Sequence, residues 1–231
     1  MSTLRDDDVT SNREIKSLLF EQVARVGKAA ASPKRLELIQ LLCQGEMSVE
    51  TLAQQADLDG KSASAHLKEL KAARLVRTRK VGRYVHYRLS DDEVVRFWVA
   101  LRTFAEARFA ELRQLERLSL AEHPVPPDRQ AMIDSARRGK VIVIDVRPAN
   151  EFATGHLPFA RSMPMADIEG RLRELPRNKD IVVYCRGPFG LLARDAVTLL
   201  LQNGFRARLL DDGIAEWRVA GLPIETNVAL A

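Results

Sequence analysis

The stretch that decides the fold of the first half of the chain is KSASAHLKELKAARLVRTRKVGRYVHYRL, residues 61–89. Its first part has apolar residues at helical spacing and predicts a helix over about 61–73. The side chains expected to face inward are those of Ala63, Leu67 and Leu70, together with the stem of Arg74. Its second part, residues 75–89, alternates apolar and polar residues around Val81-Gly82, which predicts a two-stranded hairpin with glycine at the turn.

Three helices are expected before this stretch. Apolar residues recur at helical spacing over 15–26 and 36–42, and Ser32-Pro33 is suited to cap and open the second of these helices. A shorter helix over 48–56 starts with a serine that can cap it and ends at Asp57-Leu58-Asp59-Gly60. Helix, short helix, tight turn, helix and hairpin is the order of a winged helix-turn-helix, whose second helix enters the major groove of DNA.

Positive charge is concentrated in the same region. The chain of 231 residues has a formal net charge of +5, which alone indicates a nucleic-acid partner only weakly. Residues 61–88, however, contain nine basic residues and one acidic residue. We therefore expect contacts with double-stranded DNA from the predicted helix and hairpin, through Lys61, Ser62, Ser64, His66, Lys68, Arg79, Lys80 and Arg83.

These side chains are expected to play different roles. Lys61 and Ser62 can donate to phosphates or base edges, and Lys68 is better placed for the DNA backbone. Ser64 can contact DNA or act as a cap. His66 lies beside a core leucine and can equally be a base contact or a structural donor, so both alternatives stay open. The basic residues around the hairpin tip are expected to reach phosphates or the minor groove.

A long amphipathic helix is expected over 91–121, because one stripe carries apolar residues from Val95 to Leu118. This helix is longer than one small domain can cover, so we expect it to form a homodimer interface with the helix near 14–30. The proline-rich segment after it ends the helix and is typical of a semi-rigid spacer. The expected division is a DNA-binding and dimerisation domain at 1–122, a linker at 123–127 and a second domain at 128–231.

The second half of the chain alternates helices and strands, which predicts an α/β domain with a parallel sheet. The chain as a whole is thus expected to have two domains, a mainly α winged helix-turn-helix followed by this α/β domain. Helices are expected near 129–138, 167–175 and 191–203, and strands at 141–145, 181–184 and 207–210.

Cys185 occupies the position at which a parallel sheet binds ligands. It follows the apolar strand at 181–184 and precedes Arg186-Gly187-Pro188-Phe189-Gly190, after which a helix is expected. The helix N-terminus, the arginine and the backbone amides at the glycines would all favour a thiolate, so we expect a lowered pKa for Cys185. A buried, inert cysteine does not fit a position between an arginine and glycines.

Other features limit the possible functions. The chain has two cysteines, so no disulfide framework is expected, and Cys43 lies beside leucines, as a small core residue would. His66, His86 and His123 do not have the spacing of metal ligands, and neither a metal nor a cofactor is predicted. The chain lacks a long apolar run and a signal-peptide pattern at its start, which predicts a cytoplasmic protein without a membrane partner.

The first half resembles the ArsR/SmtB family of dimeric repressors. The resemblance covers about residues 15–120 and rests on Pro33-Lys34-Arg35-Leu36-Glu37-Leu38, Ser48-Val49-Glu50-Thr51-Leu52-Ala53, Ser64-Ala65-His66-Leu67-Lys68-Glu69-Leu70 and Gly82-Arg83-Tyr84-Val85-His86-Tyr87-Arg88-Leu89. Members of that family often sense metals through cysteines on the helix before the recognition helix. Residues 48–56 contain neither cysteine nor histidine, and the first half has no second cysteine beside Cys43 for persulfide sensing.

The second half resembles a rhodanese domain over about 128–225. The resemblance rests on Asp145-Val146-Arg147-Pro148, Glu151-Phe152, Gly155-His156-Leu157-Pro158, the Cys185 loop, Asp212-Gly213 and Glu216-Trp217. It implies that Cys185 takes a sulfane sulfur from thiosulfate, a persulfide or a polysulfide and becomes a persulfide, with residues 186–190 forming the active-site loop. Supporting roles at the rim of the site are expected for Asp145, Arg147, Glu151 and His156.

Three positions depart from the patterns of rhodaneses and related enzymes. Phe159 stands where rhodanese domains commonly have glycine, and Gly190 stands where fused regulators often have a second cysteine. Cys185 therefore has no partner in its loop for a disulfide. Related phosphatases and arsenate reductases place an arginine where this chain has Leu191, so a sulfur-bearing substrate is expected rather than phosphate.

Two functions from different classes follow from these resemblances. The leading hypothesis is a DNA-binding transcription regulator, expected to be a repressor, in which a persulfide on Cys185 changes DNA binding. The alternative is a sulfurtransferase whose DNA-binding half provides only targeting or autoregulation. A third possibility, an inactive binding module, is opposed by the intact Cys185 loop. The operator, the physiological sulfur donor and acceptor and the sign of regulation stay open.

Overall fold

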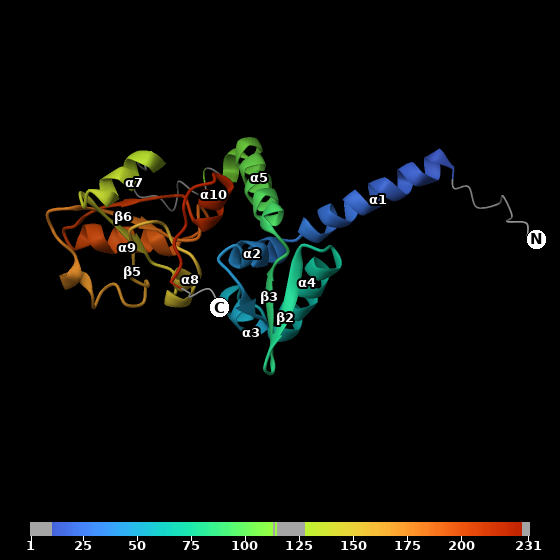
Figure 1. Ribbon diagram of the computed structural model, residues 1–231, viewed down its shortest axis with the longest axis horizontal. Helices are drawn as coiled ribbons and strands as arrows, with labels where there is room; N and C mark the ends of the chain where they lie inside the picture. Colours follow the sequence, from blue (N-terminus) through green and yellow to red (C-terminus); the bar gives the residue numbers. More distant parts are fainter. Residues whose placement is uncertain (1–10, 113, 115–127, 228–231) are drawn as a thin grey trace, which may run out of the picture.

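The computed structural model describes residues 11–112, 114 and 128–227, which form two domains (Figure 1). The N-terminal domain consists of α1 (Asn12–Ala30), α2 (Pro33–Leu42), β1 (Met47–Ser48), α3 (Val49–Gln55), α4 (Gly60–Ala72), β2 (Val76–Val81), β3 (Tyr84–Leu89) and α5 (Asp92–Arg108). The C-terminal domain consists of α7 (Arg129–Arg137), β4 (Val141–Asp145), α8 (Ala149–Thr154), β5 (Ala160–Ser162), the 3-10 turn η1 (Leu172–Glu174), β6 (Asp180–Tyr184), α9 (Leu192–Gln202), β7 (Arg206–Leu209) and α10 (Ile214–Val219). The predicted fold class is confirmed.

The helix-turn-helix is formed by α3 and α4, and side-chain caps define where each helix begins. The Ser48 hydroxyl accepts a hydrogen bond from the backbone N–H of Thr51, and the Asp59 carboxylate accepts from the N–H groups of Lys61 and Ser62. These bonds satisfy donors that a helix start otherwise leaves unpaired. The inward face of α4 is as predicted, with Ala63, Leu67 and Leu70 all fully buried.

The prediction for Arg74 is wrong. Its side chain is exposed, because the residue lies beyond the end of α4 in a left-handed conformation with φ of +60°. Helical spacing no longer determines which way a side chain points once the helix has ended.

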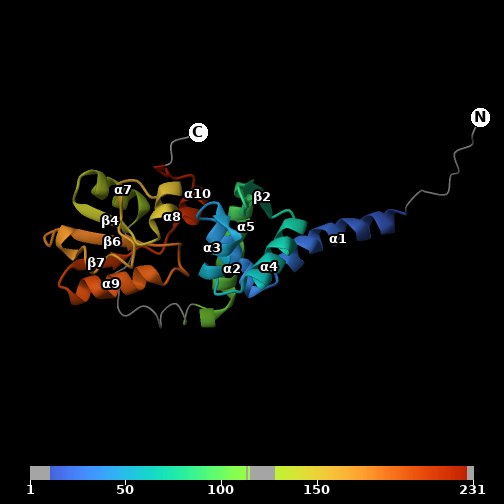
Figure 2. The same cartoon turned by 90° about the horizontal axis from the view of Figure 1, so that it is seen from below.

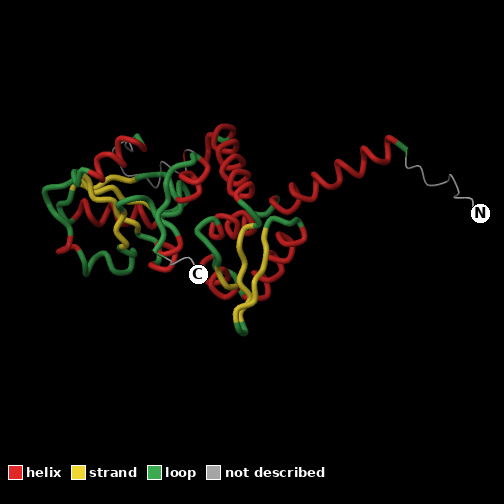
Figure 3. The backbone as a smooth tube through the Cα atoms, in the orientation of Figure 1, coloured by secondary structure: helices red, strands yellow, loops and turns green. Residues whose placement is uncertain are grey.

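The wing is the antiparallel hairpin of β2 and β3, which pair from Val76 with Leu89 to Val81 with Tyr84 (Figure 3). Gly82, at the turn, has φ of +59°, a conformation that costs glycine least. β1 joins the other side of β3, so the wing is part of a three-stranded sheet with the order β1-β3-β2.

The expected continuous helix over 91–121 is interrupted. α5 ends at Arg108 because Phe109 adopts an extended conformation, with φ of −107° and ψ of 104°, and residues 110–112 and 114 are helical again. Periodicity shows which face is apolar but does not detect a single residue leaving the helical conformation. Residues 115–121 and the predicted linker at 123–127 lie outside the described part of the chain.

The C-terminal domain is built on a four-stranded parallel sheet with the order β5-β4-β6-β7. Alternate residues of β4 and β6 point to opposite faces, so each face has its own core. α9 packs on one face with Ile144 and Val183, whereas α7 and α10 pack on the other with Val143 and Val182. Because both faces are covered, all five β4 residues are buried.

The helix expected over 167–175 does not form. The region contains turns and the short η1, while Ile168 and Leu175 are buried and anchor the segment to the sheet. Pro164, Gly170 and Pro176 punctuate the segment, which disfavours a regular helix. The short elements α8, β5 and α10 were not predicted.

The C-terminal domain lies against the side of the N-terminal domain that carries α2, α3 and α5 (Figures 1 and 2). α4 is on the other side of the N-terminal domain, and α1 extends from that domain in the direction away from the C-terminal domain (Figure 2). Ala215 of α10 belongs to the buried core cluster of the N-terminal domain, so the two cores are continuous at this point. Among the helices of the described residues, none is long and apolar enough to cross a membrane.

Candidate functional site

The predicted DNA-contacting residues lie on α4 and the wing, and α4 is on the side of the N-terminal domain away from the C-terminal domain (Figure 2). Lys61 and Lys68 are exposed on α4, and Ser62, Ser64 and His66 are half-buried. The hydroxyl of Ser62 lies 2.6 Å from the Asp59 carboxylate, to which it donates, so this side chain helps to hold the start of α4. The exposed lysines leave α4 with a positive face directed to solvent.

The basic residues of the wing differ in their surroundings. Lys80 and Arg83 are exposed, and Arg83 lies over the ring of Tyr84 while donating a hydrogen bond of 2.8 Å to its hydroxyl. Arg79 forms an ion pair with Glu46 at 2.6 Å. A phosphate would have to compete with this carboxylate for Arg79, so Lys80 and Arg83 are better placed than Arg79 to contact a phosphate.

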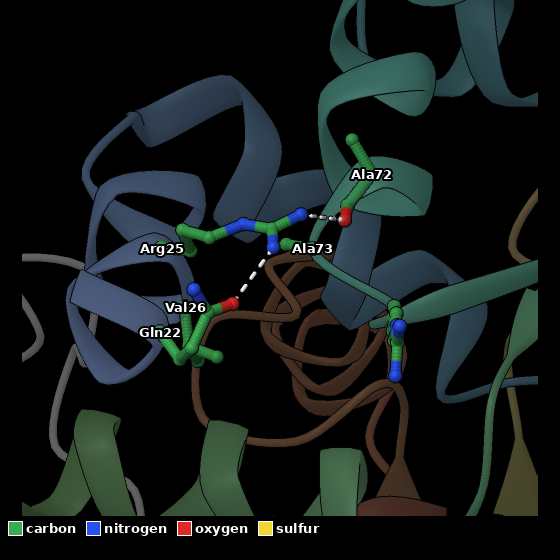
Figure 4. Close-up of a pocket in the computed structure, with 6 residues that line it drawn as sticks. Gln22, Arg25, Val26, Ala72 and Ala73 are labelled. Atoms are coloured by element: carbon green, nitrogen blue, oxygen red, sulfur yellow. Dashed lines mark hydrogen bonds between the residues drawn. The ribbon is translucent and has the colours of Figure 1, made fainter. Parts of the chain in front are cut away.

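A cavity of about 300 Å³ lies between α1 and the end of α4 (Figure 4). Arg25 crosses it and donates to the Gln22 amide oxygen at 2.8 Å and to the Ala72 carbonyl oxygen at 3.1 Å. The remaining lining residues are Val26, Ala73 and Arg74. This lining includes no nucleophile or carboxylate, and the role we assign to Arg25 is to join α1 to the C-terminal end of α4.

The Cys185 loop is wound tightly at the end of β6. The N–H of Gly190 donates to the Gly187 carbonyl oxygen at 2.8 Å, and Gly187 has φ of +94°, which favours glycine. A Cβ atom added at Gly190 would lie 3.1 Å from the Cys185 Cβ and 3.0 Å from the Arg186 nitrogen. The two glycines therefore allow the backbone to close around the thiol.

Burial, rather than positive charge, dominates the ionisation of Cys185. The residue is 2% exposed, and this desolvation raises the pKa of its thiol to about 11, although the Arg186 charge and the Arg186 N–H act in the opposite direction. The guanidinium of Arg186 also pairs with the Glu151 carboxylate at 2.5 Å, which offsets part of its charge. The expected lowering of the Cys185 pKa is thus wrong for this conformation of the loop.

A raised pKa makes a direct prediction for thiol reactivity. Since only the thiolate is alkylated, the rate for Cys185 with iodoacetamide should rise by about tenfold per pH unit between pH 7 and pH 9. It should not level off until the pH approaches the pKa of about 11. Peptide mass spectrometry resolves Cys185 from Cys43, and circular dichroism checks that the chain stays folded. A plateau already at pH 8 would contradict a protonated, buried thiol.

Asp145 and Arg147 form a buried ion pair beneath the loop. Both side chains are fully buried, and the guanidinium donates to the carboxylate through Nε at 3.0 Å and Nη2 at 2.5 Å. Tyr184 also donates to Asp145, and Arg147 donates to the Gly155 carbonyl oxygen at 2.7 Å. This network joins the ends of β4 and β6 to the segment after α8.

Of the four predicted supporting residues, Glu151 forms an ion pair with Arg186, the residue after Cys185. His156 is buried, and its ring stacks on that of Phe152, with the ring centroids 3.8 Å apart. Phe159, where glycine is common in rhodanese domains, has φ of +65°, so it adopts the conformation that glycine favours.

Several residues of the N-terminal domain also contact this site, and the sequence did not identify them. The Gln55 amide oxygen accepts from Arg186 at 2.9 Å, and Phe189 lies edge-to-face against Trp98, with centroids 6.2 Å apart. Arg102 also lies over the Phe189 ring, with its guanidinium carbon 5.9 Å from the ring centroid. Gln44 accepts from Arg147 at 2.9 Å. One signal was present in the sequence, since Arg102 interrupts the apolar stripe of α5.

The remaining predicted features concern metals and Cys43. Within residues 11–112, 114 and 128–227, no group of three or more His, Cys, Asp or Glu side chains is placed to hold a metal ion. Cys43 is fully buried in the core of the N-terminal domain, where burial raises its pKa to about 12. It packs as a small apolar residue, as predicted.

The fold is a winged helix-turn-helix domain joined to a parallel α/β domain in which the Cys185 loop follows β6. Residues 32–78 match the model of the bacterial regulatory protein, arsR family, and residues 128–220 match that of the rhodanese-like domain. The chain belongs to the arsR family of bacterial regulatory proteins and combines its helix-turn-helix domain with a C-terminal rhodanese-like domain.

Individual relatives match either the whole chain or one of its halves. The HTH-type transcriptional regulator Rv0324 of Mycobacterium tuberculosis is 38% identical over 91% of this chain and 93% of its own length. A sulfurtransferase of Allochromatium vinosum is 39% identical over 36% of this chain and 78% of its own length. Among solved structures, the homodimeric winged helix-turn-helix domain of Mb0332 from Mycobacterium bovis is 34% identical, with a TM-score of 0.40, over 48% of this chain and 95% of that one.

Proposed function

We propose that this chain is a homodimeric transcriptional repressor that binds double-stranded operator DNA through α4 and the wing, and that sulfur loading of Cys185 changes its affinity for DNA. The observation that carries this proposal is the position of the Cys185 loop, whose Phe189 lies against Trp98 of the DNA-binding domain. A change at the loop can therefore act on that domain through direct contact. For the two states of Cys185 to bind DNA differently, these contacts must differ between the states.

The sulfur chemistry requires one thiolate and one donor, for which thiosulfate serves as the example. Cys185 first loses its proton to solvent, and the thiolate attacks the sulfane sulfur of thiosulfate. A bond forms between the two sulfur atoms, the S–S bond of thiosulfate breaks, and its electron pair leaves with sulfite. Cys185 then carries a persulfide. Arg186 lies beside the thiol and lowers its pKa against the effect of burial, so this residue favours the first step.

The deciding experiment compares DNA affinity in the two states of Cys185. A duplex selected from random sequence by the reduced chain serves as the probe, and thiosulfate or polysulfide loads the sulfur, which mass spectrometry confirms. We expect the affinity to differ by about fivefold or more between the thiol and the persulfide, and to be unchanged by the same treatment in Cys185→Ser. Equal affinities, together with rapid sulfur transfer to cyanide, would instead support the sulfurtransferase hypothesis.

The proposed DNA contacts predict a change in salt dependence. Arg83→Ala should weaken binding to all duplexes alike and reduce the slope of log affinity against log salt concentration by about 0.9, the value for one phosphate contact. Filter binding at salt concentrations from about 50 to about 200 mM measures this slope. Arg137→Ala on α7 is the matched control, since Arg137 is an exposed arginine of the other domain. A slope unchanged by Arg83→Ala would exclude this residue as a phosphate contact.

The proposed homodimer rests on an apolar face of α1 that is exposed in the part of the chain that the structure describes. Leu19, Phe20 and Val23 are 63%, 66% and 72% exposed, and Phe104 of α5 is 59% exposed. Exposed apolar residues gathered on one helix mark an interaction surface, and a two-fold axis would let this face and α5 cover each other. This arrangement agrees with the predicted contribution of helices near 14–30 and 91–121.

Val23→Glu should convert the dimer to a monomer, because it places a charge in the centre of the apolar face. Light scattering after gel filtration would then give a mass near 25.9 kDa rather than twice that value. Glu21→Lys is the control, since Glu21 lies on the opposite side of α1 by helical spacing. A wild-type chain that is already monomeric at micromolar concentration would contradict the proposal.

A further inference from the structure

The closed Cys185 loop buries its thiol away from a sulfur donor. A Cβ atom added at Gly187 would lie 2.8 Å from the Glu216 carboxylate, and one at Gly213 would lie 2.5 Å from the Gly187 nitrogen. On one side the loop is therefore confined by α10. On its other side it encloses the Cys185 thiol, and Cys185 is 2% exposed. Thiosulfate has to reach the thiol to transfer its sulfane sulfur, and a thiol that is 2% exposed is closed to such a donor unless the loop moves.

The outer side of the loop is held by the DNA-binding domain. Arg186 donates both to Gln55 of α3 and to Glu151, and Gln55 also donates to Glu151 at 3.4 Å. Phe189 packs on Trp98, which is 5% exposed. Opening the loop would therefore break a charge-assisted hydrogen bond and an aromatic contact that both cross between the domains.

A third link between the domains runs through Arg102 and Glu216. The Arg102 guanidinium lies 3.2 Å from the Glu216 carboxylate, and both side chains are 6% exposed. The same carboxylate accepts from the Gly213 N–H at 2.8 Å and lies against Gly187. Arg102, a residue of the DNA-binding domain, thus holds the Glu216 carboxylate of α10 in place against the loop.

We propose that Gln55, Trp98 and Arg102 are positioning residues that hold the Cys185 loop closed, and that sulfur loading requires these contacts to open. This inference rests on the proposed function and specifies how it is regulated. Gln55 is the last residue of α3, and α4 begins after a short turn at Gly60. Release of Gln55 therefore acts at the junction of the two helix-turn-helix helices. The reciprocal consequence is that DNA, by fixing α3 and α4, changes the access of sulfur donors to Cys185.

The test measures alkylation of Cys185 by iodoacetamide at pH 8 in the full chain, without DNA or sulfur. Gln55→Ala should raise the Cys185 rate by about fivefold to tenfold, because it removes a hydrogen bond to a charged group. Gln54→Ala is the matched control, since it makes the same change at the preceding, exposed residue of α3. A second pair, Arg102→Met and the exposed Arg96→Met, tests the link through Glu216 in the same way.

Cys43 provides an internal control for general loss of stability. This thiol is fully buried in the N-terminal core beside α10, so it reacts only when that core or its contact with α10 opens. We expect a faster Cys185 reaction at an unchanged Cys43 rate, and faster addition of one sulfur atom from thiosulfate in the same variants. Cys185 rates within twofold of wild type in Gln55→Ala and Arg102→Met, or rates that rise in step with Cys43, would overturn the proposal.

The Cys185 alkylation rates and the DNA affinities of the thiol and persulfide states test the two proposals separately. If sulfur loading does not change DNA affinity but both variants open Cys185 to alkylation, the positioning roles are supported and the proposed regulation fails. If the variants leave the alkylation rate unchanged, the positioning roles fail, whatever the DNA affinities are.

Discussion

Arg147→Met should lower the free energy of unfolding of the C-terminal domain by about 3–5 kcal/mol, the usual cost of removing one partner of a buried ion pair. The substitution leaves the fully buried Asp145 carboxylate without its guanidinium, and the Gly155 carbonyl oxygen loses the hydrogen bond from Nη2. Tyr184 continues to donate to Asp145, which limits the loss but does not neutralise the charge.

Urea unfolding followed by the fluorescence of Trp217 measures this effect, because Trp217 is fully buried in the C-terminal domain. A shared Trp98→Phe background removes the second tryptophan. Arg161→Met, at an exposed arginine of β5, is the matched control and should change the free energy by less than about 0.5 kcal/mol. Adding Asp145→Asn to Arg147→Met should restore part of the loss, because the buried charge is then gone. A loss below about 1 kcal/mol would show that Asp145 is not an uncompensated charge in the variant.

Gly213→Ala is the second substitution with a large expected effect. Its methyl group would lie 2.5 Å from the Gly187 nitrogen and 2.7 Å from the Arg186 carbonyl carbon. Both are backbone atoms of the Cys185 loop, so no flexible side chain can move aside, and the loop itself must shift. Overpacking of this kind costs about 1–3 kcal/mol, and a displaced loop should also make the Cys185 thiol more accessible.

Two measurements check this prediction: urea unfolding, and the rate of Cys185 alkylation relative to that of Cys43. Gly170→Ala is the control, because a methyl group there meets its nearest atom, the Asp167 carbonyl oxygen, at an ordinary distance of 3.7 Å. If the two glycine variants unfold at the same urea concentration, Gly213 does not provide the close approach that the structure indicates.

The parts of the fold that were predicted correctly are those that depend on local patterns. The hairpin at 75–89 and the apolar strand before Cys185 carry their periodicity within a few residues, and the burial of Leu67 and Leu70 follows from spacing alone. The helix expected at 167–175 failed because apolar residues can be buried singly from an irregular segment. A pattern of burial does not determine the backbone conformation that presents it.

The candidate site was predicted less completely, for a different physical reason. The sequence identified Cys185 and its loop through the composition of a strand end, but the Cys185 pKa depends on how deeply the thiol is buried, and this is a property of the packed structure. Gln55 and Trp98 were not predicted as site residues because they contact the Cys185 loop of the other domain. The spacing of residue types within each segment does not indicate a contact between residues 55 and 186.

The hydrogen bond between Arg147 and Gln44 means that the two domains, separate in the sequence, share a buried interior. A buried group that stabilises the C-terminal sheet has one of its acceptors in the N-terminal domain, and Ala215 of α10 lies in the core of that domain. Each domain therefore completes the interior of the other. The evolutionary consequence is that neither domain can be replaced by the homologous domain of another protein without change at the shared surface, so the two are constrained to change together.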